Sequence, residues 1–244
     1  MQTRWIDYTD GDLALRGYWA QPEGDGRFPT VVVVHTFRGL TPSIQGRVAR
    51  LADAGFAAFA LDVFGPGVLP ADHDTALATI KPFQSDRPMF RRRLTAGLQA
   101  ALAQPGCDGA RVAATGYCFG GSGVLEMARA GLELRGVVTL HGEFATSLPA
   151  EPYQVRAKLL ALHGDADVVV QRDAVDAFQD ELRRAQVDWE FVSYSGAMHS
   201  FTGEGIGADS DPAAKFDAQA EIRAWARQGD FLREVLSHPA SSRS

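Results

Sequence analysis

Short apolar segments without polar alternation constrain the fold of this chain more than any other feature. A strand with one solvated face alternates apolar and polar residues, whereas a strand buried on both faces is a continuous apolar run. Segments with a helical spacing of apolar residues separate these runs, and their apolar faces include Ile44, Leu94 and Val175. Because strand and helix alternate, the sequence predicts an α/β protein with a mainly parallel, twisted sheet and helices on both faces. The apolar runs are residues 31–34, 57–61, 112–114, 137–140 and 159–162.

The two ends of the chain depart from this alternation. Residues 4–20 contain two short apolar stretches around the turn Thr9-Asp10-Gly11-Asp12, which predicts an antiparallel hairpin at the edge of the sheet. Residues 238–244 are polar and lack periodicity, so we expect a disordered tail there. A chain of 244 residues can bury its core in one unit, and we therefore expect a single domain over residues 1–237.

The charge balance and the two cysteines exclude several classes of protein. With 24 basic and 30 acidic residues the net charge is −6, which disfavours a nucleic-acid partner, because clustered Lys and Arg bind the phosphate backbone. Cys107 and Cys118 are too few for a disulfide framework and are expected to be reduced thiols. No apolar stretch approaches the ~20 residues needed to cross a bilayer. We therefore expect a cytoplasmic protein without a membrane or nucleic-acid partner, and no oligomeric state is predicted.

The stretch Gly116-Tyr117-Cys118-Phe119-Gly120-Gly121 lies between a predicted strand and a predicted helix. A strand that turns sharply into a helix holds its central side chain in a strained, exposed position, and small residues two before and two after relieve the crowding. This arrangement predicts a nucleophile elbow with Cys118 at its centre. The helix N-terminus then favours the thiolate. The amide of Phe119, with that of Phe37 after the strand at 31–34, would hydrogen-bond an oxyanion.

Two other interpretations of this stretch are structural or ligand-binding. The spacing of Gly116 and Gly121 also suits a phosphate-binding loop, but Ser122 occupies the position where that loop needs lysine. An unpaired cysteine such as Cys118 is also commonly a small buried hydrophobic residue. The position of Cys118, followed along the chain by a candidate acid and a candidate base in the order expected for an elbow enzyme, favours the nucleophile.

The candidate acid and base each follow a predicted strand. Asp167 closes Leu-His-Gly-Asp-Ala-Asp at 162–167 and is chosen over Asp165, and His199 lies in a loop before the last long helix. His163, Asp165 and Asp167 would alternatively suggest a metal site, but three alternating positions in a tight turn diverge, so no metal is expected. Ligand sites of such sheets lie at the carboxyl ends of the strands. The competing histidines are placed in polar segments (His73, His238) or at strand ends, where they would line the site without acting as base (His35, His141).

These residues resemble the dienelactone hydrolase family over nearly the whole chain. The similarity is carried by Gly-Tyr-Cys-Phe-Gly-Gly at 116–121, Leu-His-Gly-x-x-Asp at 162–167 and Met-His-Ser-Phe at 198–201. It implies an α/β-hydrolase fold, a triad of Cys118, Asp167 and His199, oxyanion donors at Phe37 and Phe119, and no cofactor. It also implies hydrolysis of a small-molecule carboxylic ester or lactone through a thioester acyl-enzyme.

Two positions depart from the family's pattern, and both concern the substrate. The family usually has Glu after the strand-end residue that is His35 here, whereas this chain has Thr36, whose hydroxyl cannot accept the thiol proton at neutral pH. Glu143 is a candidate to supply a carboxylate from another direction. The family's dienelactone enzyme also offers an arginine after the base for the substrate carboxylate, whereas Glu204 stands here and would repel it.

The pocket itself is predicted less specifically. Arg87 or the run at 91–93 would reach the pocket from the preceding helix to hold an anionic group, and for the run a solvated helix face is the alternative. We expect an apolar lining, with ordinary core packing as the alternative for each member. The candidates are Phe37, Phe64, Tyr117 and Met198, with Thr36 and Glu143 as polar neighbours.

Two further functions compete with ester hydrolysis. A catalytically silent α/β-hydrolase-fold protein that binds a ligand or partner would explain Thr36, but it has no physical need for an intact Cys118, Asp167 and His199. A thiol redox role would need a resolving cysteine near Cys118, and Cys107 is expected on the far side of the intervening strand.

Overall fold

One eight-stranded sheet forms the centre of the computed structural model, which describes residues 1–203 and 213–237. The two outermost pairs on one side are antiparallel, β1 with β2 and β2 with β4, and every other pair is parallel. The predicted mainly parallel α/β sheet is thereby confirmed. Across the sheet the strands are β1 (Gln2–Asp10), β2 (Leu13–Gln21), β4 (Ala57–Leu61), β3 (Phe28–Val34), β5 (Cys107–Tyr117), β6 (Gly136–Leu140), β7 (Lys158–Gly164) and β8 (Trp189–Tyr194).

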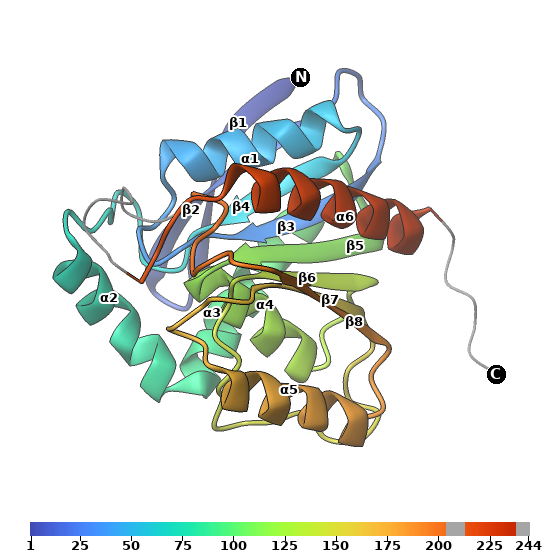
Figure 1. Ribbon diagram of the computed structural model, residues 1–244. Helices are drawn as coiled ribbons and strands as arrows, with labels where there is room; N and C mark the ends of the chain where they lie inside the picture. The colour runs from blue at the N-terminus through green and yellow to red at the C-terminus, as the bar shows by residue number, and fades with distance from the viewer. Residues whose placement is uncertain (204–212, 238–244) are drawn as a thin grey trace.

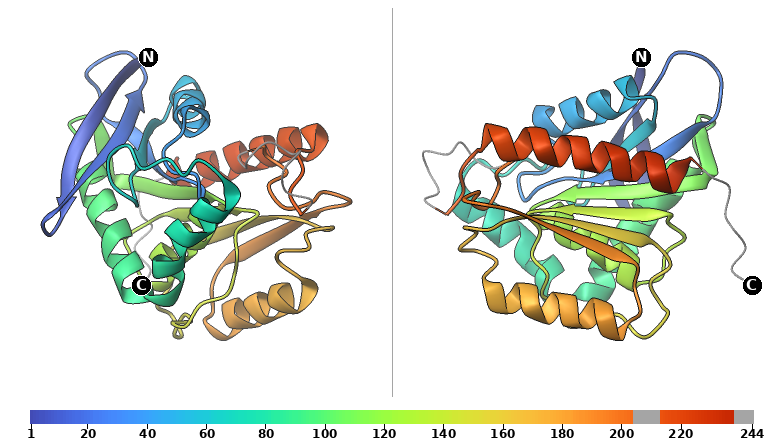
Figure 2. Two further views of the ribbon diagram at one scale, coloured as in Figure 1. Left: turned by 90° about the vertical axis from the view of Figure 1, so that its left-hand side faces the viewer. Right: turned by 45° about the vertical axis from the view of Figure 1, so that its right-hand side comes forward.

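Helices cover both faces of this sheet (Figure 1). One layer contains α1 (Pro42–Asp53) and α6 (Ala218–Leu236), and the opposite layer contains α3 (Arg87–Leu102), α4 (Phe119–Arg129) and α5 (Arg172–Arg184). Figure 2 shows the two layers from further sides. The remaining helix, α2 (His73–Ser85), lies beside α3 at the edge of its layer. None of the described helices is both long and apolar enough to span a membrane.

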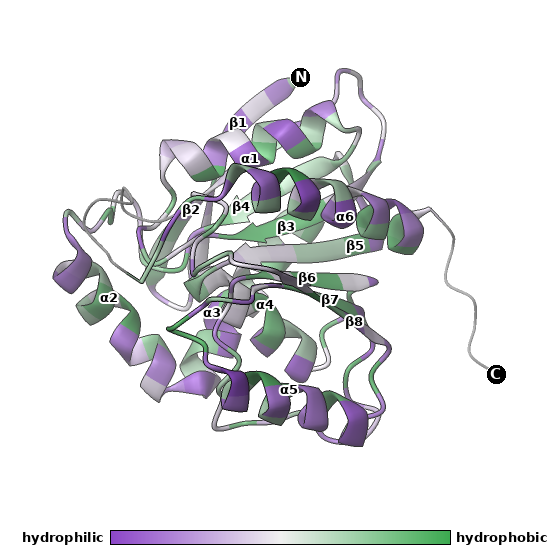
Figure 3. Ribbon diagram, viewed as in Figure 1, coloured by the Kyte–Doolittle hydropathy of each residue, from purple (hydrophilic) through white to green (hydrophobic). Residues whose placement is uncertain are grey.

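The continuous apolar runs are strands that are buried on both faces. Val32 and Val34 of β3 pack in the cluster that contains α3 and α4, whereas Val31 and Val33 pack with α1 and α6. All four side chains are fully buried. The hydropathy colouring shows the same pattern, because the central strands are apolar while the helices carry polar residues on their outer sides (Figure 3). Successive side chains of a strand point to opposite faces, so a two-sided core requires apolar residues at every position.

The predicted hairpin and the predicted helix around Ile44 are both present in the structure. β1 and β2 form the expected hairpin, and Gly11 in its turn has φ +60°. Thr41 caps α1 by accepting a hydrogen bond from the amide of Ile44, and Pro42 begins the helix. Residues 238–244, where we predicted a disordered tail, lie outside the described residues.

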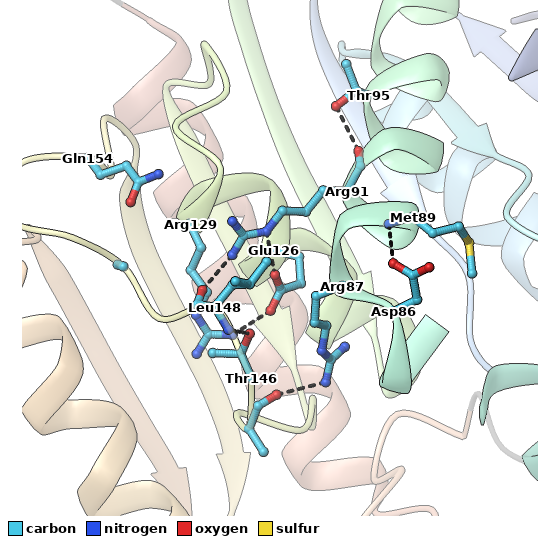
Figure 4. Close-up of polar contacts among 12 residues, drawn as sticks. Asp86, Arg87, Met89, Arg91, Thr95, Glu126, Arg129, Thr146, Leu148 and Gln154 are labelled. Carbon is cyan, nitrogen blue, oxygen red and sulfur yellow. Dashed lines mark hydrogen bonds and ion pairs between the residues drawn. The ribbon is translucent and has the colours of Figure 1, made fainter. Parts of the chain in front are cut away.

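Three arginines of α3 and α4 hold the irregular connection between β6 and β7 (Figure 4). Arg129 donates to the fully buried Glu126 and, through two nitrogens, to Glu181 at 2.7 and 2.8 Å. Arg91 donates to the other oxygen of Glu126 at 2.7 Å. These two arginines and Arg87 each also donate to a backbone carbonyl of the connection. The acceptors are the carbonyls of Phe144 (Arg129), Leu148 (Arg91) and Ala145 (Arg87).

The arginine run at 91–93 is a solvated helix face only in part, because Arg92 is exposed whereas Arg91 is half-buried and Arg93 is buried. Arg92 and Arg93 donate to the two oxygens of Asp10 in the hairpin, and Arg93 donates in addition to the carbonyl of Val63. With Arg91 bound to Glu126, all three guanidinium groups bind protein acceptors. The run therefore ties α3 to the first hairpin and to α4. Consecutive arginines on a helix do not indicate by themselves which acidic residues of the tertiary structure will pair with them.

We expect Arg129→Met to lower the free energy of unfolding by about 3 kcal/mol, because it leaves two buried carboxylates short of their partner. Chemical denaturation measured by circular dichroism checks this value. Arg233→Met is the control, since Arg233 pairs with Asp230 on an exposed surface and should change stability by less than about 1 kcal/mol. Equal effects of the two substitutions would contradict the structural importance of the buried pair.

Candidate active site

Cys118 lies at the sharp turn between β5 and α4. Its backbone has φ 54° and ψ −118°, a conformation that non-glycine residues rarely adopt. The flanking glycines make the turn sterically feasible, because a Cβ on Gly116 would lie 2.0 Å from the carbonyl oxygen of Gly120. A Cβ on Gly120 would lie 2.1 Å from the carbonyl oxygen of Val34 in β3. The turn therefore presents a partly exposed thiol at the N-terminus of α4.

A chain of two hydrogen bonds joins Cys118 to His199 and Asp167. His199 Nε2 lies 3.3 Å from Cys118 Sγ, and His199 Nδ1 lies 2.8 Å from Asp167 Oδ2. The other oxygen of Asp167 accepts the amides of Val169 and Val170 at 2.8 and 2.9 Å. Both the Asp167 and His199 side chains are buried. The acid is thus fixed by backbone donors, and it orients the imidazole toward the thiol.

The electrostatics of this chain favour a protonated His199. Burial alone would lower the pKa of His199, but attraction to Cys118 and hydrogen bonds to Asp167 and Cys118 outweigh it and raise the pKa to about 10. Burial would raise the pKa of Asp167, and the bond and charge of His199 together with the Val170 amide lower it below its ordinary value. These contacts therefore favour the protonated form of His199 at neutral pH.

His141 supports the turn from behind, a role that our sequence analysis missed. Burial lowers the pKa of His141 well below its ordinary value, and the nearby His199 lowers it further, so the ring is neutral. Its Nδ1 accepts the Cys118 amide at 3.1 Å, which leaves the proton on Nε2 to be donated to Thr202 Oγ1 at 2.8 Å. The residue itself has φ 39°, and Ser200 has φ 55°. Non-glycine residues with positive φ thus occur in three segments that meet at this site, at Cys118, His141 and Ser200.

Two backbone amides are placed where the elbow prediction expects oxyanion donors. Phe119 is the first residue of α4, where no intrahelical acceptor exists for an amide. Phe37 follows β3, and both residues line the cavity that contains Cys118. Neither amide donates a hydrogen bond within the described part of the chain. These donors are therefore free for a ligand oxygen.

A cavity of about 200 Å³ opens beside Cys118 and is bounded on one side by α2. Positions 73, 77, 80 and 84 of this helix share one face, as the 3.6-residue period requires. The sequence predicted no helix here, and His73 was expected in a polar segment. Two signals were available, namely Asp72, whose side chain accepts the Thr75 amide as N-cap, and the helical spacing of Ala76, Ile80 and Phe83. The described lining is Phe37, His73, Leu77, Ile80, Gln84, Cys118, Phe119, Glu143, Val169, His199, Ser200, Ala213 and Ala214.

Four of the proposed pocket residues do not belong to this lining. Tyr117 is fully buried with α1 and α6 on the opposite face of the sheet, since it precedes the turn by one strand position. Phe64 packs against Phe119 and Phe83 behind the cavity. Thr36 is buried, and its hydroxyl accepts the Arg38 amide at 3.2 Å. Met198 is half-buried beside His199.

Among the polar candidates, Glu143 lines the cavity. Arg87 and the run at 91–93 are not part of the described lining. Glu204, whose charge we expected to repel a substrate carboxylate, lies outside the described residues. Within residues 1–203 and 213–237 no group of three or more His, Cys, Asp or Glu side chains is arranged to hold a metal ion. Of the residues weighed as a metal cluster, Asp167 instead binds His199, and the ring of His163 packs against Phe144 and Phe191.

Comparison with known proteins places this geometry in context. The sequence profile of the dienelactone hydrolase family matches residues 15–236. A Methylorubrum extorquens protein provisionally named carboxymethylenebutenolidase is 28% identical over 239 residues, covering 91% of this chain and 78% of that protein. An uncharacterized Caenorhabditis elegans protein is 34% identical over 151 residues, which is 61% of this chain and 95% of that protein.

Solved structures are similar over a greater length. A dienelactone hydrolase-like promiscuous phosphotriesterase from metagenomic libraries superposes with a TM-score of 0.89 at 37% identity, covering 96% of this chain and 98% of that one. An Anabaena variabilis dienelactone hydrolase superposes with a TM-score of 0.67 at 16% identity, covering 96% of this chain and 98% of that chain, which supports the fold alone.

We expect Gly120→Ala to destabilise the protein by about 3 kcal/mol, because its Cβ would overlap the backbone of β3. Gly46→Ala is the matched control, since Gly46 lies in α1 with open space around it and alanine should stabilise that helix by up to about 1 kcal/mol. Thermal or chemical unfolding distinguishes the two variants. A neutral Gly120→Ala would show that α4 does not approach β3 this closely.

We expect the His199 imidazole to titrate near pH 10 and to lose part of this elevation in Cys118→Ala, where attraction to the thiol is absent. Nuclear magnetic resonance of ¹⁵N-labelled imidazoles follows each titration directly. Below pH 10 the ring is protonated and can donate to a leaving group, so kcat/KM should fall as the pH rises through this value. Titration near pH 6.5 in both proteins would contradict the ion pair.

Proposed function

This chain belongs to the dienelactone hydrolase family, whose profile spans residues 15–236, and we propose that it hydrolyses carboxylic esters or lactones through a thioester on Cys118. The observation that carries the proposal is the chain of contacts from Cys118 Sγ to His199 Nε2 at 3.3 Å and from His199 Nδ1 to Asp167 at 2.8 Å. Acyl transfer requires a nucleophile in contact with a base, and a base that is oriented by an acid.

The first half-reaction forms the thioester. The Cys118 thiolate attacks the substrate carbonyl carbon, and the carbonyl electron pair moves to oxygen. The amides of Phe37 and Phe119 stabilise this oxyanion, a type of contribution worth several kcal/mol in acyl-transfer enzymes. When the carbon–oxygen bond breaks, the leaving alkoxide or enolate takes the proton of His199 Nε2. For a lactone the leaving oxygen remains attached to the acyl group.

The second half-reaction releases the acid. The now neutral His199 removes a proton from water, whose oxygen attacks the thioester carbonyl. Collapse of the second oxyanion expels the Cys118 thiolate and restores the imidazolium beside it. Asp167 keeps the same imidazole tautomer throughout, because its other oxygen is bound to two backbone amides.

Thr36 does not weaken this proposal. The hydroxyl of Thr36 accepts the Arg38 amide at 3.2 Å and so stabilises the turn after β3. His199 already lies within hydrogen-bonding distance of Cys118 Sγ without substrate. We therefore propose that the thiolate is present in the free enzyme. The same contacts argue against a silent binding protein, which has no use for an ion pair held by a buried acid.

Hydrolysis of p-nitrophenyl esters from acetate to octanoate tests the proposal. We expect Cys118→Ala to lower kcat by at least about a thousandfold, because it removes the nucleophile. Intact-mass measurement at early times should show an acyl adduct on the wild type and none on Cys118→Ala. Hydrolysis that persists unchanged in a folded Cys118→Ala, or ester turnover with no adduct and no burst at any chain length, would count against the thioester.

A further inference from the structure

Glu143 presents a carboxylate to the cavity from the connection after β6. Gln84 Nε2 of α2 donates to Glu143 Oε2 at 3.1 Å, and both residues line the cavity. The backbone carbonyl of Glu143 accepts the Ser122 hydroxyl of α4 at 2.9 Å. The residue is therefore held at its backbone and at one carboxylate oxygen. Within residues 1–203 and 213–237 the Glu143 carboxylate accepts a hydrogen bond at Oε2 alone, so Oε1 remains available to a ligand.

No lysine or arginine of the described lining offsets this charge inside the cavity. Arg87 attracts Glu143, but its guanidinium is buried and donates to the carbonyl of Ala145, and it does not line the cavity. The titratable lining residues other than Glu143 and Cys118 are His73 and His199. A ligand at this end consequently meets a carboxylate, while the neighbouring cation faces the connection behind it.

Apolar side chains separate the end of the cavity at Glu143 and Gln84 from the end at His73. His73 and Gln84 are eleven residues apart on one face of α2, which corresponds to about 16 Å along the helix axis. Apolar side chains of Leu77 and Ile80 lie between them on the same face. The cavity therefore suits an elongated ligand with an apolar middle and a polar terminus directed at Glu143.

We propose that Glu143, oriented by Gln84, is a specificity-determining residue that selects esters or lactones bearing an ammonium or another hydrogen-bond-donating group and rejects those bearing a carboxylate. The inference rests on the proposed hydrolysis only for the identity of the substrate, because the charge selection itself is a property of the cavity. Attraction and repulsion act together in such a site. The Glu143 carboxylate attracts a cationic substrate group. A substrate carboxylate in the same place would lose its hydration and lie beside a like charge.

Charged thiol reagents test the selection without any requirement for turnover. The probes are 2-(trimethylammonium)ethyl and 2-sulfonatoethyl methanethiosulfonate, which match in size and differ in charge. In each reaction the Cys118 thiolate attacks the sulfenyl sulfur, a mixed disulfide forms and methanesulfinate leaves. Intact mass gives the rate, and Cys118→Ala reports any labelling of the buried Cys107. The cation-to-anion rate ratio of the protein is divided by the same ratio measured for 2-mercaptoethanol, which removes the difference in intrinsic reactivity between the two reagents.

We expect the cation-to-anion rate ratio of the wild type to exceed that reference at least about tenfold and to fall about tenfold in Glu143→Gln. Glu143→Lys should invert the preference. Glu151→Gln is the matched control, since Glu151 is an exposed carboxylate on the same connection between β6 and β7, and should leave the ratio unchanged. Equal ratios in the wild type, Glu143→Gln and Glu151→Gln would overturn the proposal.

A second measurement extends the test to substrates. The kcat/KM values of 4-(trimethylammonio)phenyl acetate and 4-acetoxybenzoate, each relative to methyl 4-acetoxybenzoate, should diverge in the wild type and converge in Glu143→Gln. Turnover of all three esters with no such convergence would overturn the selection and leave ester hydrolysis intact. Absence of turnover with charge-selective labelling would overturn the proposed hydrolysis and support the selection at Glu143.

Discussion

The close approach of the first turn of α4 to the centre of the sheet is the constraint on which the site depends. Gly120 lies against the carbonyl of Val34, and Gly116 lies against Gly120 itself, at separations that exclude any side chain. This contact forces the chain to turn within a single residue, Cys118, and gives that residue its positive φ. The thiol, the free amide of Phe119 and the N-terminus of the helix consequently meet at one point. A looser junction would separate the Cys118 thiol from these backbone donors.

The parts of the site that come from distant segments are joined by contacts other than the one between Cys118 and His199. His141 links the Cys118 amide to Thr202, and Arg47 of α1 donates to the carbonyl of Thr202 and to Glu221 of α6. Arginines of α3 and α4 likewise donate to backbone carbonyls of the connection that contains Glu143. Because each support ends on a backbone group, the positions of the reacting side chains are set by the fold and do not rely on the reacting groups themselves.

The fold and the sharp turn at Cys118 could be predicted from the sequence because their requirements are local. An elbow needs small residues at fixed offsets, and a two-sided strand needs an unbroken apolar run, so Gly116, Gly120 and the strand at 31–34 could be interpreted without tertiary information. Tyr117 shows the limit of this approach. It adjoins Cys118 in the sequence, but alternation along β5 directs its side chain into the core on the opposite face.

The helix α2 and the arginine run show why other predictions were incomplete. The apolar face of α2 covers a cavity, so its pattern is interrupted by His73 and Gln84, and a proline lies in its last turn. Such a pattern resembles a polar loop when amphipathicity is the criterion. Arg92 and Arg93 both pair with Asp10, which lies 82 and 83 residues away from them in the chain. Pairings of that kind follow from topology, which no local spacing encodes.

The distance along the chain between Cys118 and His199, 81 residues, has a consequence for synthesis. The segment that forms the elbow leaves the ribosome before β8 and before α6, and the loop of His199 is itself tied by bridges to Ala214 and Lys215. Domains form from the N-terminal side as the chain emerges. A nascent chain therefore carries Cys118 without His199 beside it, and the contact between the two side chains forms only after the segment that contains His199, Ala214 and Lys215 has been translated and docked.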